Sequence, residues 1–120
     1  MKNKSPIIFL QDILDSIQQI EIYITDLDFE DFASQRLIVD AVVRNLEIIG
    51  EAAKNLPEDF RQQHQDIPWK NMIGLRNIVI HEYFGIDMSI IWEIITKDLL
   101  SIKPTIQNLV MSVQTSPKMV

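Results

Sequence analysis

The sequence contains no cysteine, which excludes disulfide bonds, thiolate metal sites and cysteine nucleophiles. Glycine is also scarce, with three residues in 120, whereas an α/β or all-β fold of this length usually needs more turn residues. A chain without disulfides fits a reducing compartment. These two deficits favour a helical protein.

Long hydrophobic runs are missing as well. The apolar segment at residues 6–10 is followed at once by Gln11 and Asp12, so it is shorter than the apolar stretch of a signal peptide. No run approaches the roughly 20 apolar residues that a membrane helix needs. We therefore expect a soluble, cytoplasmic protein that does not bind membranes.

Basic residues are outnumbered, because Lys and Arg total 11 and Asp and Glu total 17, giving a net charge of −6. Broad binding of nucleic acid needs clustered Lys and Arg to neutralise phosphates, so the acidic balance argues against it. Seven of the acids lie in residues 12–31, which contain no Lys or Arg. Between residues 69 and 87 the charges cancel, so the acidic balance does not exclude a small cleft in which two Arg76 side chains meet.

Helical periodicity is what the sequence does contain. The length suits one domain, and a chain of this size can bury a real core. Apolar residues recur every three or four positions, as on one face of a helix, through residues 10–27, 37–56, 69–80 and 90–113. The pattern predicts an all-α fold, an antiparallel bundle of four long helices plus a short helix within 58–65. We expect one helical domain over residues 1–113 and a flexible C-terminal tail over 114–120.

Helix ends can be predicted from a few residues. Ser5 and Pro6 form a plausible cap and first turn for a helix over residues 6–27, and an acidic turn follows at 26–31. Pro57 stops the second helix, and Asp87 can cap the last one.

Two helix-breaking residues lie inside predicted helices. An interior glycine costs about 1 kcal/mol relative to alanine, so Gly50 suggests that two helices approach closely there. Pro104 predicts a kink or break near residues 101–103.

Only two histidines could act in acid–base chemistry. His64 lies in a polar stretch and is interpreted as a solvated loop residue. His81 ends an apolar helix and follows Arg76 by five residues, which places the two about 140° apart around an ideal helix. They converge only if Arg76 bends across, or if a second copy of the helix faces the first. This geometry suggests a symmetric dimer with a shared cleft.

The polar residues of this helix suit RNA cleavage without a metal ion. His81 would act as general base toward the 2′-OH or as the acid for the leaving oxygen, because its pKa is ordinarily near neutrality. Arg76 would hold the scissile phosphate in its planar fork and stabilise the developing charge. Asn77 would orient either partner, and Tyr83 offers a phenol for hydrogen bonding or modification. The alternative is a helix C-terminus with a dipole-stabilised histidine and a structural Arg–Glu network.

Residues 76–83, RNIVIHEY, resemble the R-x4-6-H motif of HEPN-domain ribonucleases, and more closely the R-x4-H-x-Y form of HepT-like toxins. The resemblance extends over nearly the whole chain, because residues 44–53, 67–70, 83–87 and 91–92 are similar to the same family. The ordered set of segments is specific, although the short motif alone is not.

The resemblance implies a HEPN-like helical bundle that dimerises with its two motifs at the interface. It implies a metal-independent endoribonuclease that needs no cofactor and acts as the toxin of a type VII toxin–antitoxin system. By position, Arg76 and His81 are the catalytic pair and Asn77 is a supporting residue. The implied partner is an MntA-like nucleotidyltransferase antitoxin, which neutralises the toxin by transferring AMP to Tyr83.

Two other functions stay open. One is a catalytically inactive HEPN module that binds a nucleotidyltransferase partner or nucleotides through the same cleft, and the other is a helical dimer with no site. The presence of both Arg76 and His81 favours the enzyme. Trp69 and Trp92 are interpreted as anchors of the core or of a dimer interface rather than as base-stacking platforms.

A charged stripe on the second helix is open to more than one interpretation. Its members recur at helical spacing, and they are Asp40, Arg44, Glu47 and Glu51. The stripe faces the motif cleft or a partner subunit, or it is a solvated helix face.

Overall fold

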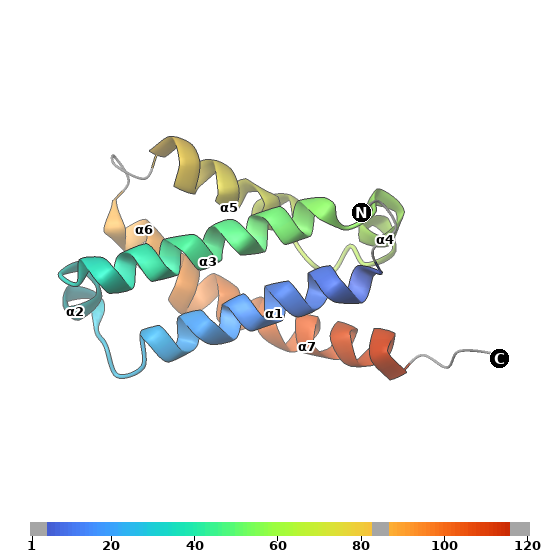
Figure 1. Cartoon of the computed structure of the whole chain (residues 1–120), viewed down its shortest axis with the longest axis horizontal. Coiled ribbons are helices and arrows are strands. Elements are labelled where there is room, and N and C mark those ends of the chain that lie inside the picture. Colours follow the sequence, from blue (N-terminus) through green and yellow to red (C-terminus); the bar gives the residue numbers. More distant parts are fainter. Residues whose placement is uncertain (1–4, 83–86, 116–120) are drawn as a thin grey trace.

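The computed structural model describes residues 5–82 and 87–115, with side chains for residues 5–77 and 87–113, and this part of the chain is helical without strands (Figure 1). The elements, in chain order, are α1 (Pro6–Tyr23), α2 (Phe29–Ala33), α3 (Arg36–Asn55), α4 (Glu58–Gln63), α5 (Trp69–Glu82), α6 (Met88–Glu93), a π-helical turn (Ile94–Asp98) and α7 (Leu99–Thr115). The predicted all-α fold is confirmed.

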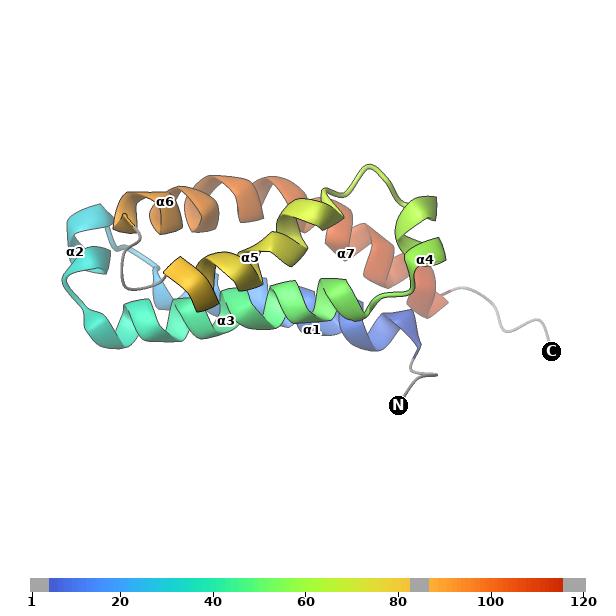
Figure 2. The same cartoon turned by 90° about the horizontal axis from the view of Figure 1, so that it is seen from above.

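Helix α3 is central in the arrangement, because it packs along α1 on one side and along α5 on the other. Helix α1 also packs against α7. Figure 2 shows α6, the π-helical turn and α7 as one long rod on the side of the bundle opposite α3. The four long helical stretches of the prediction are therefore α1, α3, α5 and the α6–α7 rod.

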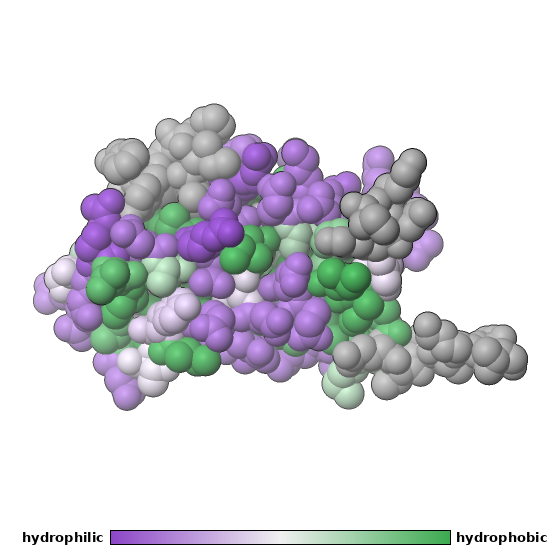
Figure 3. Space-filling view, viewed as in Figure 1, coloured by the Kyte–Doolittle hydropathy of each residue, from purple (hydrophilic) through white to green (hydrophobic). Residues whose placement is uncertain are grey.

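The core is built from the apolar faces that the periodicity identified. Its fully buried side chains come from nearly every long element and include Leu10, Ile13, Ile17, Ile20, Phe32, Val42, Leu46, Ile49, Ile91, Ile95 and Ile106. Trp69 is buried, and Trp92 is half-buried and packs against the core, with its ring centroid 5.2 Å from that of Phe32. Of the two predicted roles, anchor of the core or of a dimer interface, these positions support the first. Hydrophilic side chains cover most of the face that carries α1 and α3, where hydrophobic ones form separate patches (Figure 3). None of the described helices is long and apolar enough to span a lipid bilayer.

Polar side chains cap the helices at two predicted positions. The Ser5 side chain accepts a hydrogen bond from the backbone N–H of Ile7 at 3.3 Å, and Pro6 occupies the first turn of α1. The Asp87 carboxylate accepts from the backbone N–H of Ser89 at 2.9 Å and caps α6. The first helix ends at Tyr23 rather than at residue 27, because the turn that follows places Asp26 at a positive φ of 64°.

The acidic segment predicted as a turn contains a helix that the periodicity did not predict. The Asp28 carboxylate accepts from the backbone N–H of Asp31 at 2.8 Å, and the Asp31 carboxylate accepts from the backbone N–H of Asp28 at 3.3 Å. This reciprocal capping box starts α2, which carries Phe32 into the core. Two of the acids in this segment therefore define a helix start.

Of the kink or break predicted near residues 101–103, the break was wrong. Helix α7 runs through Pro104 without interruption. The irregularity lies one turn earlier, in the π-helical turn at Ile94–Asp98, where the Thr96 hydroxyl donates to the backbone carbonyl of Trp92 at 2.6 Å. Helix α7 reaches Thr115, and the rest of the predicted tail, residues 116–120, lies outside the described residues.

Candidate functional site

The close helix approach predicted from Gly50 occurs between α3 and α5, at Arg76. A Cβ atom added to Gly50 would lie 2.9 Å from the backbone nitrogen of Arg76 and 3.1 Å from the carbonyl oxygen of Met72. Such distances leave no room for a side chain, so glycine allows the two backbones to pack directly against each other. Arg76 is thereby held against the C-terminal half of α3.

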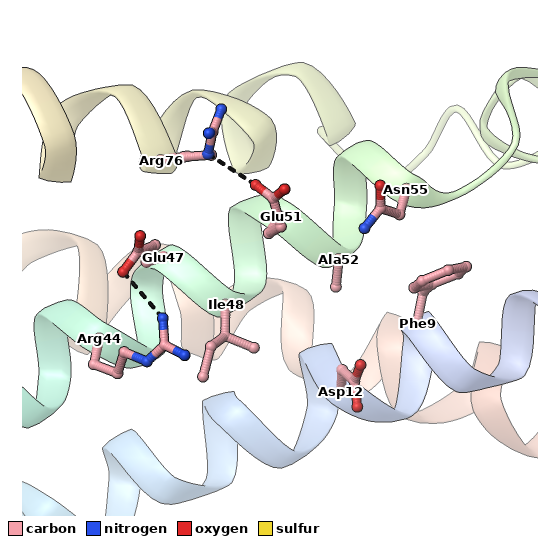
Figure 4. Close-up of a pocket in the computed structure, with 9 residues that line it drawn as sticks. All are labelled: Phe9, Asp12, Arg44, Glu47, Ile48, Glu51, Ala52, Asn55 and Arg76. Carbon is pink, nitrogen blue, oxygen red and sulfur yellow. Dashed lines mark hydrogen bonds and ion pairs between the residues drawn. The ribbon is translucent and has the colours of Figure 1, made fainter. Parts of the chain in front are cut away.

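The side chain of Arg76 forms an ion pair with Glu51 of α3, in which Nε lies 2.8 Å from Oε1 (Figure 4). The Arg76 side chain is 37% exposed and the Glu51 side chain 48% exposed, so the pair lies at the surface and can be reached from solvent. The outer end of the guanidinium extends away from Glu51 (Figure 4). This end is free of the carboxylate and can face an incoming anion.

Arg76 borders a groove of about 380 Å³ between α1, α3 and α5. The groove is lined by Phe9, Asp12, Arg44, Glu47, Ile48, Glu51, Ala52, Asn55 and Arg76. Three members of the charged stripe, Arg44, Glu47 and Glu51, therefore face the groove that Arg76 borders. This supports the interpretation that the stripe faces the cleft of the motif. Asp40 does not line the groove, and its Oδ1 lies 3.0 Å from Nε of Arg36.

The charges in the groove nearly balance. Arg44 Nη1 lies 3.2 Å from Glu47 Oε1, so each of the two arginines has a glutamate beside it, and Asp12 adds a third acid. Such a surface does not attract polyanions over a long range, in keeping with the acidic composition. It can bind a phosphate only through close, directed contacts, such as those that the Nη end of Arg76 offers.

The other predicted site residues are described less fully. Asn77 is exposed on α5 and does not line the groove. His81 lies in the last turn of α5, but its side chain falls outside the described side chains, and Tyr83 lies outside the described residues. The structure therefore places Arg76 in detail, whereas the pairing of Arg76 with His81 stays a prediction.

His64 lies away from the groove, after the end of α4. It is half-buried rather than fully solvated, with its ring centroid 4.6 Å from that of Phe60. Its backbone carbonyl accepts a hydrogen bond from the Trp69 indole N–H at 2.9 Å. Among the side chains that the structure describes, no three of His, Asp or Glu come together as a metal site.

Three groove residues carried no signal in the sequence. Phe9 and Asp12 come from α1 and Asn55 from the end of α3, and only packing brings these segments together beside Arg76 (Figure 4). Phe9 follows the apolar pattern of its helix, and Asp12 and Asn55 are exposed polar residues of common types. Without the fold, nothing distinguishes them from other surface residues.

Comparison with known protein families gives a match over most of the chain. The model of the HepT-like ribonuclease family matches residues 13–111, which include α3 and the whole of α5. The chain belongs to the HepT-like ribonuclease family. As members of this family are ribonucleases, the predicted class of enzyme, a ribonuclease of the HEPN type, is confirmed.

Three curated relatives of this HepT-like chain are similar to it over most of their own length. A protein of Methanocaldococcus jannaschii named "Putative RNase MJ1380" is 44% identical over 82% of this chain and 91% of its own. A "Probable ribonuclease HepT" of Thermococcus cleftensis is 42% identical over 84% of this chain and 92% of its own. A "Putative RNase TTE0752" of Caldanaerobacter subterraneus is 41% identical over 88% of this chain and 95% of its own. No solved structure shows a significant match to the chain.

Proposed function

We propose that this HepT-like ribonuclease is the toxin of a toxin–antitoxin system and cleaves RNA with Arg76 and His81. The observation that carries the proposal is the position of Arg76, a half-exposed guanidinium at the edge of a groove, in the helix that also contains His81. A planar fork of N–H donors suits the non-bridging oxygens of a phosphodiester.

The proposed reaction is an attack of a ribose 2′-OH on the adjacent phosphorus. The imidazole of His81 takes the 2′-OH proton as general base, while the 5′-oxygen of the next nucleotide leaves and takes a proton from an imidazolium acting as general acid. The products are a 2′,3′-cyclic phosphate and a 5′-hydroxyl. Arg76 stabilises the charge that builds on the phosphate oxygens, and the neighbouring Asn77 orients the pair. No step requires a metal ion or cofactor.

A dimer would supply the two histidine roles. Arg76 and His81 lie about 140° apart around α5, so one helix alone does not direct both side chains to the same point. A second copy related by a two-fold axis can bring its own pair opposite the first. One copy of His81 then serves as base and the other as acid.

The proposed partner is an MntA-like nucleotidyltransferase antitoxin, which would modify Tyr83. The phenol oxygen attacks the α-phosphorus of ATP, loses its proton and releases pyrophosphate, leaving AMP on the tyrosine. Tyr83 follows Arg76 by seven residues in the same motif, so the adenylate would add negative charge and bulk to the site of the catalytic arginine. The added group would block entry of an RNA phosphate by repulsion and size.

The test is expression of the chain alone in a bacterial host. We expect growth arrest with the wild type and none with Arg76→Ala or His81→Ala. Full toxicity of both variants at equal protein levels would remove the catalytic assignment, whereas no arrest with the wild type would favour the inactive binding module. Light scattering of the purified chain should give the mass of two chains, and a monomer would remove the shared cleft.

The partner is tested by intact-mass analysis after co-expression with a nucleotidyltransferase encoded beside this gene. We expect the chain to gain the mass of one or more AMP groups, and Tyr83→Phe to gain none. An unmodified wild-type chain whose toxicity is nevertheless neutralised would show that the antitoxin acts by binding alone.

A further inference from the structure

Two consecutive residues of α3 hold Arg76. Gly50 receives the backbone of Arg76, because any Cβ at this position would lie 2.9 Å from the Arg76 nitrogen. Glu51 receives the side chain, through the 2.8 Å contact between its Oε1 and Nε of the guanidinium. One turn of α3 therefore fixes both the backbone and the charged group of Arg76.

The contact with Glu51 uses one side of the guanidinium. Nε is the donor nearest the aliphatic stem, and the two Nη atoms carry the other four N–H donors. In Figure 4 the Nη end extends beyond the carboxylate, away from α3. Glu51 therefore restrains the arginine without occupying the edge that suits bidentate binding of a phosphate.

The ion pair between Arg76 and Glu51 adds little to the stability of the fold. Both side chains are between a third and a half exposed, and ion pairs at such positions contribute little to the free energy of unfolding. By contrast, a group that stabilises a transition state gains from being fixed in advance, because a misplacement of about 1 Å can lower a rate by about 100-fold.

We propose that Glu51 is a positioning residue for the ribonuclease reaction, which holds the Arg76 guanidinium at the groove with its Nη end turned to the scissile phosphate. The inference rests on the proposed role of Arg76. It also gives a function to part of the charged stripe, since Glu51 acts on Arg76 while Glu47, one turn earlier, pairs with Arg44.

Glu47 provides the matched control. Glu47→Ala removes the same charge from the same helix and the same groove, but it leaves the Arg76 pair in place. We expect Glu51→Ala to lower kcat for RNA cleavage by about 10-fold to 100-fold with little change in KM, because the charge of Arg76 still attracts the phosphate. Glu47→Ala should keep kcat within about twofold of the wild type. Glu51→Gln keeps the shape and an acceptor oxygen, so it should recover part of the loss.

Side-chain NMR tests the restraint separately from activity. The chain has four arginines, so their Nε–H signals can be assigned, and Arg44 is the internal reference because its pair uses Nη1. The Nε–H order parameter of Arg76 should exceed that of Arg44 and should fall in Glu51→Ala but not in Glu47→Ala. Melting temperatures of the folded variants should stay close to that of the wild type.

Three results would overturn the inference. A higher kcat/KM in Glu51→Ala would show that the carboxylate blocks Arg76, and equal losses in Glu51→Ala and Glu47→Ala would show an effect of groove charge alone. An unchanged Arg76 order parameter in Glu51→Ala would show that Glu51 does not restrain the Arg76 side chain. This conclusion would hold even if Arg76→Ala is inactive. Full cleavage by Arg76→Ala would instead refute the proposed function itself.

Discussion

Gly50 and Arg76 are in backbone contact, with room for a hydrogen atom but not for a methyl group between them. A Cβ at Gly50 would lie 2.9 Å from the Arg76 nitrogen and 3.1 Å from its Cβ. Because these neighbours are backbone or next to it, they cannot rotate out of the way as the end of a flexible side chain could. Gly50 therefore determines both the packing of α3 on α5 and the position of Arg76.

Gly50→Ala should lower the free energy of unfolding by about 1–2 kcal/mol. Because the nearest atoms are backbone, the cost of overpacking should lie in the upper part of its usual range, about 2–3 kcal/mol, and the gain of about 1 kcal/mol in helix propensity offsets only part of it. Gly74→Ala is the matched control, since a Cβ at Gly74 in α5 meets no atom within 4 Å. We expect it to stabilise the chain by up to about 1 kcal/mol. Urea unfolding of both variants measures the difference, and equal stabilities would contradict the account of the helix contact.

The ion pair between Lys103 of α7 and Glu21 of α1 should contribute more to the free energy of unfolding than the other lysine pair of the described chain, Lys97–Glu93. Its N–O distance is 2.7 Å, and its side chains are 23% and 30% exposed. A double-mutant cycle with Lys103→Met and Glu21→Gln should give a coupling of about 1 kcal/mol in urea unfolding. The same cycle on Lys97 and Glu93, which are 3.6 Å apart and well exposed, should give almost none. A larger coupling energy for Lys97 and Glu93 than for Lys103 and Glu21 would contradict this prediction.

Asp87 should make stability depend on pH at acidic values. The backbone N–H of Ser89, and after it the Ser89 side chain, hold the pKa of the Asp87 carboxyl below its ordinary value of 3.8. The unfolded chain therefore binds this proton more tightly, so the stabilisation is present above pH 3.8 and is lost as the pH falls through the lower pKa of the folded state.

Asp87→Asn isolates this effect, because asparagine also caps helices but does not titrate. Thermal unfolding of the wild type and of Asp87→Asn should show a difference in Tm that favours the wild type near neutral pH and disappears as the pH falls below the carboxyl range. A difference that is constant with pH would show that the charge of Asp87 plays no part in capping α6.

Much of the fold follows from local sequence signals. The period of the apolar residues identified α1, α3, α5 and the last helical rod, and Ser5 and Asp87 marked helix starts by their side-chain chemistry. Helix α2 was missed because five residues are too short for a periodic pattern, although its capping box was readable at Asp28 and Asp31. Pro104 lies inside α7 and does not end it, although a proline inside a helix often breaks or kinks that helix, so the sequence alone did not locate the end of this element.

The candidate site was predictable only in part. Arg76 stands out in an apolar helix, and Gly50 signals the helix that approaches it. The partnership of Arg76 with Glu51 was not predictable, because these residues lie 25 positions apart and their contact depends on the register of α5 against α3. The same holds for Phe9 and Asp12, which join the groove through the packing of α1 on α3.

Cleavage of RNA by the purified chain tests the central claim most directly. Wild type, Arg76→Ala, His81→Ala and the control Arg44→Ala, which changes the other arginine of the groove, are compared under single-turnover conditions with a chelator present. We expect Arg76→Ala and His81→Ala to lower the rate by about 100-fold or more, as loss of a charge-stabilising donor or of a general acid–base does. Arg44→Ala should keep most of the activity. Wild-type rates in both Arg76→Ala and His81→Ala would contradict the account.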